Sequence, residues 1–435
     1  MLVRLRTYLA VAAVFTSAMV EAVSAEVTLE FIGTVLATDV SADGSVIVGN
    51  TFGEYETFRW TTAGGVVPLG RATVPELGVG AGTPNVSSDG TRVSGTILGA
   101  DDTYATQGIW TLGQGWQECL PMPSDAGIID QSLASAWGLS GDGNTLTGLY
   151  WRAGQPGGSA HPSRWTEATG VVDLGTQGSG TCMTCGSGRA NDVNEDGSVI
   201  VGWIENPNFG NWWPTVWVDG VRTVLKETEG FSEANGVSPD GLTILGDSWF
   251  PPITAGSLAE AAVWRWDGNQ WVEQRLGKLP GTAPPFGLAT ASGITADGSV
   301  IVGYNRFGAG NETGFIWTQA TGMVDIVAYL TANGITLPPG FDVGTVSAIS
   351  DDGSTIVGVG SYTTPPFEAR SFKITRCVLT GDMNKDSVVD GLDIEGFIRA
   401  KLGEPAMAGE NQLCADYGGT LEEDSAAFSA DLLGG

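Results

Sequence analysis

The sequence predicts an all-β fold, a seven-bladed β-propeller with repeats of about 50 residues, followed by a small α-helical unit. Three observations support this. One short pattern recurs seven times, each copy is followed by further short apolar runs, and the 435-residue chain combines 65 glycines and 15 tryptophans with few charges. Such a composition is typical of many short strands joined by tight turns.

The recurring pattern places Asp-Gly between two short apolar runs, the second of which ends in Gly. Its copies span 39–49, 85–95, 138–148, 192–202, 236–246, 293–303 and 348–358. Asp-Gly between apolar runs predicts a β-hairpin with the pair at its tip, because glycine accepts positive φ without steric cost. We therefore interpret the repeated aspartates as turn formers rather than as catalytic carboxylates.

Each predicted hairpin is followed by a third apolar run and, after a glycine-containing turn, by a fourth. The third run carries a tryptophan at one recurring position: Trp60, Trp110, Trp165, Trp217, Trp264 and Trp317. A residue that recurs once per repeat is expected to pack between blades, so we favour a core role over sugar stacking. Four runs per repeat fit the four strands of a propeller blade.

The two ends of the repeat array are expected to share one blade. The seventh repeat has a third run at 369–375, with Phe372 in place of the tryptophan, but it lacks a fourth run. The unassigned strand 27–33 precedes the first hairpin and can complete that blade, which removes the exposed edges of a linear array. The alternative is a right-handed β-solenoid, whose coils are usually shorter and more regular.

The N-terminus predicts a signal peptide over 1–25, so that 26–376 form the propeller. Arg4 and Arg6 precede an apolar stretch over 7–20 that is too short to span a bilayer, and the small residues at 23–25 suit cleavage. An uncleaved anchor is the alternative. We expect a secreted protein, extracellular or on the cell surface. The formal net charge of −29 excludes nucleic acid and an anionic membrane surface as partners.

Five cysteines fit an oxidising compartment. Cys182 and Cys185 lie in a glycine-rich stretch without a following helix, so a loop disulfide is favoured over a redox motif. Cys377 and Cys414 bracket the C-terminal segment and are expected to pair. Cys119 then remains as a free thiol. The single histidine excludes a histidine-rich metal site.

A ligand is expected at the loops between the second and third strands, because these loops vary in length on one face of the repeats. They carry the candidate ligand-binding residues Tyr150, Trp151, Trp203, Trp212, Trp213, Asp247, Trp249 and Phe250. Aromatic rings with amides nearby suit a neutral sugar chain, so a polysaccharide is the expected ligand. The alternative is that these rings pack locally beneath the loops.

An enzymatic alternative also stays open. A polysaccharide-acting enzyme needs two carboxylates held about 5–10 Å apart. The candidates outside the repeated pattern are Asp101, Asp102, Glu205, Asp247 and Glu260. Nothing in the sequence pairs them, so no catalytic residue is assigned. A third reading is a purely structural cell-surface component.

The segment 377–435 differs in composition and predicts a calcium loop followed by a helix. Oxygen ligands stand at loop positions 1, 3, 5, 9 and 12, and Val388 contributes its carbonyl at position 7; the side-chain ligands are Asp382, Asn384, Asp386, Asp390 and Asp393. Ser387 occupies position 6, where glycine normally makes the turn, so reduced affinity is expected. The alternative is a solvated acidic loop.

This segment resembles a type I dockerin, a family with two calcium loop–helix units in about 60 residues. The five side-chain ligands match the family's first loop, whereas the second unit, 414–434, keeps Asp416 but has a shortened ligand register. The resemblance implies Ca²⁺ as cofactor and a cohesin-like or other extracellular protein as partner. An intramolecular cap on the propeller is the alternative.

Residues 27–375 resemble the extracellular HAF-repeat family, whose units combine an [IV]-[NS]-x-x-G-x-[VI]-V-G run with a Phe/Trp run and a DLG run. Segments 192–203 and 170–178 carry these motifs. The resemblance implies a repeat fold and carries no catalytic residues. Together, these features predict a secreted, non-catalytic propeller that binds a carbohydrate or protein and is tethered through 377–435.

Overall fold

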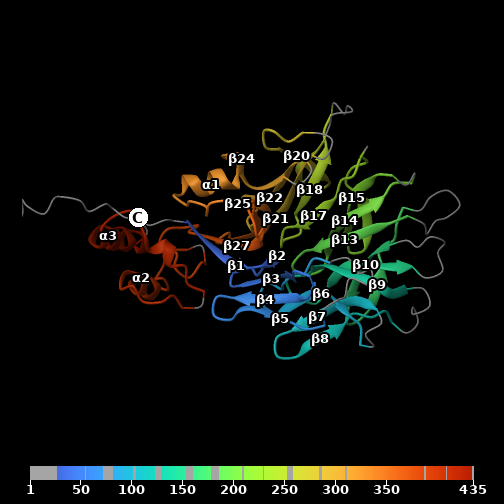
Figure 1. The fold of residues 1–435 in the computed structure, drawn as a ribbon, viewed down its shortest axis with the longest axis horizontal. Helices are drawn as coiled ribbons and strands as arrows, with labels where there is room; N and C mark the ends of the chain where they lie inside the picture. The colour runs from blue at the N-terminus through green and yellow to red at the C-terminus, as the bar shows by residue number, and fades with distance from the viewer. Residues whose placement is uncertain are drawn as a thin grey trace, which may run out of the picture.

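In the computed structural model, short antiparallel strands form seven blades around one axis (Figure 1). The structure describes residues 27–433 apart from 54, 72–81, 101–103, 123–128, 153–159, 178–185, 208–209, 229, 252–257, 284–286, 309–310, 387 and 408. The predicted signal peptide therefore lies outside the described residues. The all-β, seven-bladed propeller is confirmed.

Blades 1 to 3 occupy the first part of the ring. Blade 1 contains β2 (Val35–Val40), β3 (Val46–Thr51), β4 (Thr57–Thr61) and β5 (Gly65–Pro68). Blade 2 contains β6 (Arg92–Leu98), β7 (Ala105–Thr111) and β8 (Gly115–Glu118), with its first strand reduced to a bridge between Val86 and Val93. Blade 3 contains β9 (Ile129–Leu139), β10 (Leu146–Arg152), β11 (Ala160–Thr166) and β12 (Gly170–Asp173). One parallel bridge, Ala105 to Leu133, joins blades 2 and 3.

Blades 4 to 6 have four strands each. Blade 4 contains β13 (Gly188–Val193), β14 (Val199–Glu205), β15 (Trp212–Val218) and β16 (Val221–Val224). Blade 5 contains β17 (Ala234–Val237), β18 (Thr243–Trp249), β19 (Ala259–Trp266) and β20 (Trp271–Gly277). Blade 6 contains β21 (Leu288–Ile294), β22 (Val300–Gly308), β23 (Asn311–Thr318) and β24 (Gly322–Asp325).

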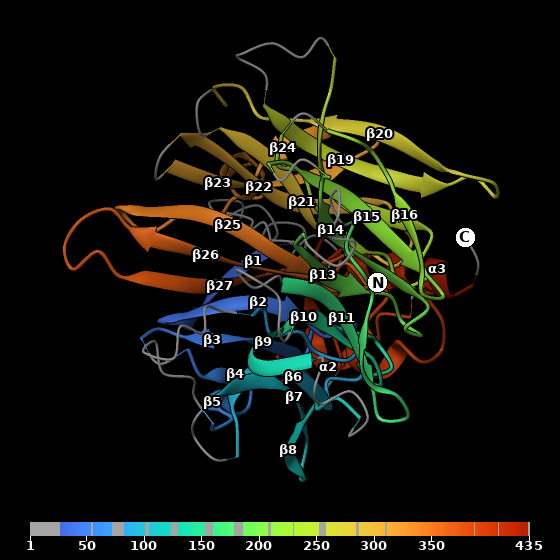
Figure 2. The ribbon, with the colours of Figure 1, turned by 90° about the vertical axis from the view of Figure 1, so that its right-hand side faces the viewer.

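Blade 7 combines the two ends of the propeller, as predicted. It contains β25 (Phe341–Ile349), β26 (Thr355–Tyr362), β27 (Ala369–Arg376) and β1 (Val27–Gly33). Strand β1 pairs antiparallel with β27, from Val27 opposite Arg376 to Phe31 opposite Phe372. The ring is therefore closed by strand pairing, and Figure 2 shows β1 and β27 lying together between β26 and β2.

The seven Asp-Gly turns are built alike, which explains their repetition. In every copy the aspartate Oδ1 accepts the N–H of the second residue after it, at 2.8–3.0 Å. The glycine that follows each aspartate has φ between +70° and +79°, where a side chain would be strained. The prediction that these aspartates are turn formers is confirmed.

A belt of backbone hydrogen bonds links these turns around the axis. The Ala42 N–H donates to Ser88, the Ser88 N–H to Gly141, and the Asp352 N–H to Ala42, which crosses the seam between the first and last blades. Pro239 accepts the bond from Glu195 but has no N–H to donate, so blade 5 does not continue the belt to blade 6.

The recurring tryptophans belong to the core. Trp60, Trp165, Trp217, Trp264 and Trp317 are buried, and only Trp110 is partly exposed. In blade 7 the equivalent position is Ile374, which pairs with Ile356 as Trp60 pairs with Ile47; Phe372 instead matches Phe58. The assignment of Phe372 to the tryptophan position was therefore wrong by two residues.

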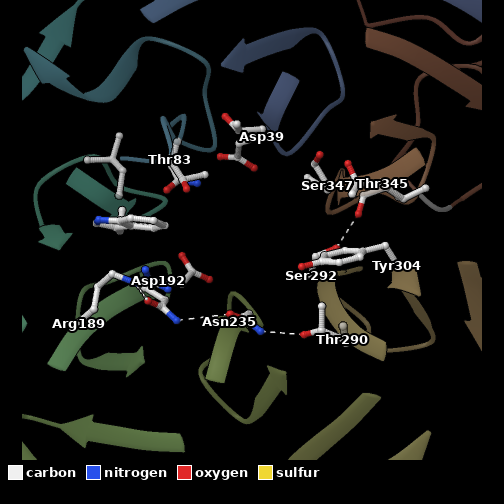
Figure 3. Close-up of a pocket in the computed structure, with 18 of the residues that line it drawn as sticks. Asp39, Thr83, Arg189, Asp192, Asn235, Thr290, Ser292, Tyr304, Thr345 and Ser347 are labelled. Carbon is white, nitrogen blue, oxygen red and sulfur yellow. Dashed lines mark hydrogen bonds between the residues drawn. The ribbon is translucent and has the colours of Figure 1, made fainter. Parts of the chain in front are cut away.

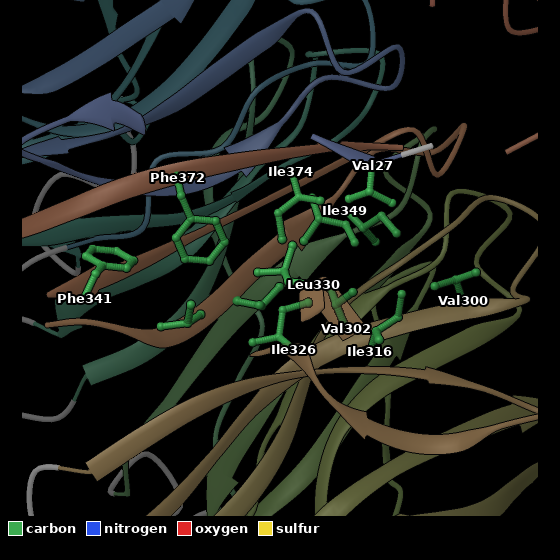
Figure 4. Close-up of a cluster of buried hydrophobic side chains, with 13 residues drawn as sticks. Val27, Val300, Val302, Ile316, Ile326, Leu330, Phe341, Ile349, Phe372 and Ile374 are labelled. Atoms are coloured by element: carbon green, nitrogen blue, oxygen red, sulfur yellow. The ribbon is translucent and has the colours of Figure 1, made fainter. Parts of the chain in front are cut away.

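A helix that follows blade 6 fills the space between blades 6 and 7. Helix α1 (Ile326–Ala332) buries Ile326 and Leu330 against strands of both blades (Figure 4). Val27 of β1 belongs to the same cluster, so the first described residue is anchored in the core of the closing blade. Other members of this cluster include Val300, Ile316, Phe341, Phe372 and Ile374.

The C-terminal segment forms a separate helical unit beside the ring (Figure 1). It contains α2 (Ile394–Lys401), the short 3₁₀ helix η2 (Gln412–Ala415) and α3 (Leu421–Leu432). Phe397 and Phe428 stack with ring centroids 4.0 Å apart, and Lys401 pairs with the buried Asp424. In the part of the chain that the structure describes, every helix is too short or too polar to cross a membrane.

Candidate ligand site in the axial channel

The channel is lined by the first strand of each blade, and β-bulges place polar residues on its wall. The ladder between first and second strands shifts between Ala37 and Asp39, between Ala190 and Asp192, and at the same place in blades 5, 6 and 7. The bulged residues of these five blades are Thr38, Asn191, Asn235, Ser292 and Ser347, and blade 3 has the same bulge at Trp137. Because a bulge redirects side chains, it brings these small polar groups to the channel.

The repeated glycine of the second strand makes room for the bulge. A Cβ built on Gly49 would lie 1.9 Å from the Leu36 carbonyl oxygen, and one on Gly202 would lie 2.0 Å from that of Arg189. Only glycine permits this close approach. The glycine that ends the repeated pattern is therefore needed for the channel wall as well as for the fold.

Two cavities lie along the axis and meet at a waist. The larger, of about 360 Å³, is lined by residues from all seven blades, and the smaller, of about 120 Å³, lies at the Asp-Gly turns. Four residues line both cavities: Asp39, Asp192, Ser292 and Ala348. In Figure 3 the carboxyl groups of Asp39 and Asp192 point into the open centre from two blades.

The two waist carboxyl groups are held by neighbouring blades. Asp39 Oδ2 accepts the Val86 N–H at 2.8 Å, and Asp192 Oδ2 accepts the Val237 N–H at 2.9 Å. Burial raises the pKa of each carboxyl group to about 7, and the charge of Asp39 raises the pKa of Asp192 further. Near neutral pH each group therefore exchanges between a hydrogen-bond donor and a carboxylate.

The smaller cavity carries a third carboxyl group with a raised pKa. Burial, together with the charges of Glu195 and Asp352, raises the pKa of Asp351 to about 6. Glu195 lies in the same wall and accepts a hydrogen bond from the Ser88 hydroxyl at 2.6 Å. An anionic ligand is therefore disfavoured in this half of the channel.

The wall of the larger cavity is a connected polar surface. The Arg189 guanidinium lies 3.7 Å from the centre of the Trp137 ring and forms an ion pair with Glu233. The Asn235 amide donates to the Thr290 hydroxyl at 2.8 Å (Figure 3). Arg189 is therefore neutralised and oriented, while amide and hydroxyl groups beside it can bind a polar ligand.

Among the predicted ligand residues, Asp247 lies next to this wall. It is 8% exposed, and Thr290 and Asn235 hydrogen-bond to its side chain. Burial, with the charge of Glu233, raises the pKa of Asp247 well above its usual range. Asp247 thus supports the channel wall through Asn235 and Thr290.

The predicted aromatic residues pack against protein to a large extent. Tyr150 is completely buried in the core of blade 3, so its ring cannot contact a ligand, which corrects its assignment. Trp203 stacks on Trp212 at 4.1 Å, and Trp213 and Trp249 donate from their indole N–H groups to backbone carbonyls. Phe250 packs against the core cluster of blades 4 and 5, and Trp151 is half-buried.

Among the described residues, the candidate catalytic carboxylates Glu205 and Glu260 are held by other groups. Glu260 is bound by Arg275 and Lys278, and Glu205 accepts the Ser187 N–H at 3.1 Å. Asp101 and Asp102 lie outside the described residues. The acidic residues that line both axial cavities are instead Asp39 and Asp192.

The sequence contains a signal for these two aspartates that the predicted ligand site did not include. Both stand at the first position of the repeated pattern, where the other copies have Asn85, Gly138, Gly236, Gly293 and Ala348. Comparison of that column would have singled out the two carboxylates. What the sequence did not show is the bulge, which turns this position toward the axis.

Side chains of the predicted calcium loop accept hydrogen bonds from the backbone of the same loop. The Asp386 N–H donates to Asp382 Oδ1 and Asn384 Oδ1, and the Val388 N–H donates to Asp386 Oδ1 at 3.0 Å. The fully buried Asp393 accepts the N–H groups of residues 383, 384 and 390. The left-handed residue of the loop is Lys385, at φ +66°, and Ser387 lies outside the described residues.

The donor set has the chemistry that calcium requires, since carboxylate and amide oxygens alternate along the loop. In the described residues no group of three or more His, Cys, Asp or Glu side chains is arranged to hold a metal ion. Calcium binding by Asp382, Asn384, Asp386, Val388, Asp390 and Asp393 therefore stays a prediction.

The cysteines fall into three environments. Cys377 and Cys414 form a disulfide that closes the C-terminal unit. Cys119 is free and buried, and burial raises the pKa of its thiol well above the usual value. The predicted Cys182–Cys185 pair lies outside the described residues.

Comparisons with known proteins assign no family to the chain. No family model and no curated protein matches the chain, so the HAF-repeat and dockerin resemblances stay predictions. The propeller domain of Myceliophteria thermophila Cps50 (Swd1) matches at 9% identity over 81% of this chain and 100% of that chain, with a TM-score of 0.48. The propeller domain of the Pyrococcus furiosus Trilobed protease matches at 15% identity, over 80% and 94%, with a TM-score of 0.43.

A third similar structure is TolB from Acinetobacter baumannii. It shares 12% identity and has a TM-score of 0.38. The match covers 66% of this chain and 62% of that chain, so less than two thirds of its length is matched.

Proposed function

We propose that the protein is a secreted, non-catalytic propeller that binds a small carbohydrate in its axial channel. The observation that carries this proposal is the waist, where Asp39 and Asp192 meet a ring of amide and hydroxyl groups. The larger cavity, of about 360 Å³, has the size of a small-molecule site. A neutral polyol suits it, because carboxyl groups repel anions and Glu233 already neutralises Arg189.

Calorimetry with neutral mono- and disaccharides of glucose, xylose, mannose and galactose tests this proposal. Asn235→Ala removes an amide from the wall and is expected to lower the affinity about tenfold, as for one lost hydrogen bond in a buried site. Gln117→Ala, on the exposed outer strand of blade 2, is the matched control. Absence of binding for every sugar, or equal binding by both variants, contradicts the proposal.

A second candidate function is glycoside hydrolysis, favoured by the two carboxyl groups with pKa values of about 7. A group that is partly protonated at neutral pH suits a general acid. In this reading one aspartate donates a proton to the leaving oxygen, while the other, ionised, accepts a proton from the water that attacks the anomeric carbon. Release of reducing sugar from oligosaccharides, abolished by Asp39→Asn or Asp192→Asn without loss of sugar binding, would establish this activity over simple binding.

The C-terminal unit is proposed as the tether. Its first loop supplies oxygen ligands for Ca²⁺, and the dockerin resemblance suggests a cohesin-like partner. On the full-length protein we expect millimolar calcium to raise the unfolding temperature of this unit, because a ligand that binds the folded state stabilises it by about 2.7 kcal/mol at 100 times its Kd. The variant Asp382→Ala/Asp386→Ala should lose this response, whereas Asp416→Ala, in the shortened second loop, should keep it.

Partner binding is measured separately. A type I cohesin module serves as the probe in surface plasmon resonance, with calcium and with chelator. Calcium-dependent capture supports the tether. If calcium binds without capture, the intramolecular cap becomes the better account of this unit.

A further inference from the structure

The outer hairpin of blade 5 is longer than those of the other blades. In blades 1, 2, 3, 4 and 6 the ladder between third and fourth strands ends at the pairs Thr61–Gly65, Thr111–Gly115, Thr166–Gly170, Val218–Val221 and Thr318–Gly322. In blade 5 it continues one pair further, and that pair is Trp266 opposite Trp271. Blade 7 also pairs at this place, Arg376 opposite Val27, but its outer strand comes from the N-terminus and not from a hairpin. Among the outer hairpins the extension is confined to blade 5, so the packing that all repeats share does not explain it.

The position of Trp266 is not aromatic in any other blade. The Trp266 N–H donates to the Leu242 carbonyl, as the Leu112 N–H donates to Thr91 and the Asp219 N–H to Ser198. These bonds make Leu112 and Asp219 the counterparts of Trp266. An indole that is 40% exposed at this place therefore contributes little to the common fold.

The two indoles form one side of a groove between blades 4 and 5. The groove has a volume of about 610 Å³, and its other side is β16 with the end of β15. Exposed apolar residues line it, among them Val218, Val221 and Leu242. Trp271 packs partly into the core, and the centre of its ring lies 5.3 Å from that of Trp266. The exposed Trp266 ring is therefore supported by a ring that the core holds in place.

The polar residues of the groove are all uncharged. Asn269 and Gln270 lie in the turn between Trp266 and Trp271, and Thr223 lies on β16 across the groove. None of the residues that line the groove in the described part of the chain is Asp, Glu, Lys, Arg or His. This is notable in a chain with 69 charged residues and a net charge of −29. An uncharged wall offers no ion pair to a charged partner, and a second copy would bring two strongly acidic molecules together.

We propose that this groove, the Trp groove, binds a neutral glycan chain. The apolar C–H face of a pyranose ring stacks on Trp266, and the amides of Asn269 and Gln270 with the Thr223 hydroxyl bind ring hydroxyl groups. The groove lies on the outer strands of blades 4 and 5, whereas the axial channel is lined by the first strands. The two sites are therefore separate, and this proposal does not depend on ligand binding in the channel.

Isothermal titration of the full-length protein with neutral hexasaccharides tests the Trp groove. The probes are cellohexaose, xylohexaose, mannohexaose and laminarihexaose. For at least one of them we expect binding that Trp266→Ala weakens by about fivefold or more. Trp266→Phe keeps a stacking ring and should retain most of the affinity. Leu112→Ala, at the equivalent exposed position of blade 2, should leave the affinity unchanged.

Two results would overturn this assignment. One is absence of binding by the wild type for all four hexasaccharides, or binding that is equal in Trp266→Ala. The other is concentration-dependent dimerisation of the wild type, measured by sedimentation, that Trp266→Ala abolishes, because the groove would then be an interface between copies. Asn235→Ala separates the sites: loss of hexasaccharide binding in that variant, with Trp266→Ala unaffected, would place the glycan in the channel.

Discussion

Asp39 and Asp43 belong to the same repeat, four residues apart, but the fold gives their carboxyl groups opposite acid–base behaviour. Burial at the channel waist raises the pKa of Asp39 to about 7. At the turn, burial acts in the same direction, but hydrogen bonds from Ser45 and Ser41 outweigh it and lower the pKa of Asp43. Asp192 and Asp196 repeat this contrast in blade 4.

The difference lies first in burial, which is deeper at the waist, and then in the donors that each carboxylate receives. The turn aspartate is surrounded by N–H and hydroxyl donors, so its ionised form is solvated by the protein. The waist aspartate receives backbone N–H donors alone, from Val86 and Val40 for Asp39, and its carboxyl group points into the channel. The turn aspartate serves the fold, whereas the waist aspartate leaves a carboxyl group available to a ligand.

The largest expected effect concerns the waist pair. A group whose pKa is raised by folding stabilises the folded state at low pH, and this contribution is lost as the pH rises through its folded-state value. We therefore expect the wild type to lose stability between pH 5 and pH 8. Because Asp39 and Asp192 stay partly exposed at the channel, the loss should be about 2–3 kcal/mol for the two groups together.

Chemical denaturation at pH 5, 6, 7 and 8 measures this loss. The variant Asp39→Asn/Asp192→Asn should lose clearly less stability across that range, since Asn keeps an acceptor for the backbone N–H and cannot ionise. The slope that remains comes from Asp351 and Asp247, whose pKa values are also raised. Asp43→Asn/Asp196→Asn is the matched control and should retain the wild-type slope. An unchanged slope in the waist variant would remove the contrast between the two positions.

A smaller effect is expected at a single turn. Asp89 accepts hydrogen bonds from the Ser87 hydroxyl, the Thr91 N–H and the Thr91 hydroxyl. Asp89→Ala leaves these donors without their acceptor and should lower the free energy of unfolding by about 1–2 kcal/mol at pH 7. Asp89→Asn keeps one acceptor oxygen and should lose less.

The same turn should respond to acid rather than to alkali. Hydrogen bonds lower the pKa of Asp89 despite some burial, so its contribution is present above the unfolded-state value and is lost as the pH falls below about 4. Denaturation curves of the wild type and Asp89→Ala should therefore converge on acidification from pH 5 to pH 3. A gap that stays constant over this range would show that the carboxylate charge is not what stabilises the turn.

The repeat explains why so much of the fold was accessible from sequence. The Asp-Gly turn and the glycine of the second strand recur in all seven repeats, and the tryptophan recurs in six. Each copy therefore supports the structural interpretation of the others. The closure of the ring followed from counting strands, and β1 beside β27 confirms it. Phe372 was misplaced because it sits two residues from the recurring position, and a short apolar run does not reveal such a shift.

The candidate site was less accessible, because it depends on where a side chain points. Period-two alternation along a strand assigns Thr38 and Asp39 to opposite faces, whereas the bulge directs both to the channel. The aromatic residues of the loops between second and third strands led to the prediction of a ligand site there, yet Tyr150 and Trp203 are buried. Asp39, Asp192 and Trp266 differ from their counterparts at equivalent positions of the other repeats. Such residues indicate candidate sites better than residues outside the repeat do.

The smallest expected effect tests whether the turns also hold the C-terminal unit. The Lys385 ammonium group donates to the Asp43 carbonyl at 2.8 Å and lies 3.6 Å from Asp352 Oδ2, so one residue of the predicted calcium loop contacts the turns of the first and last blades. Lys385→Ala should lower the free energy of unfolding by about 0.5–1 kcal/mol, as expected for a partly exposed ion pair. Salt screens such a pair, so the difference from wild type should shrink in 1 M sodium chloride. A difference that is independent of salt would mean that Lys385 acts through its left-handed backbone in the loop, and the turn aspartates would then serve the propeller alone.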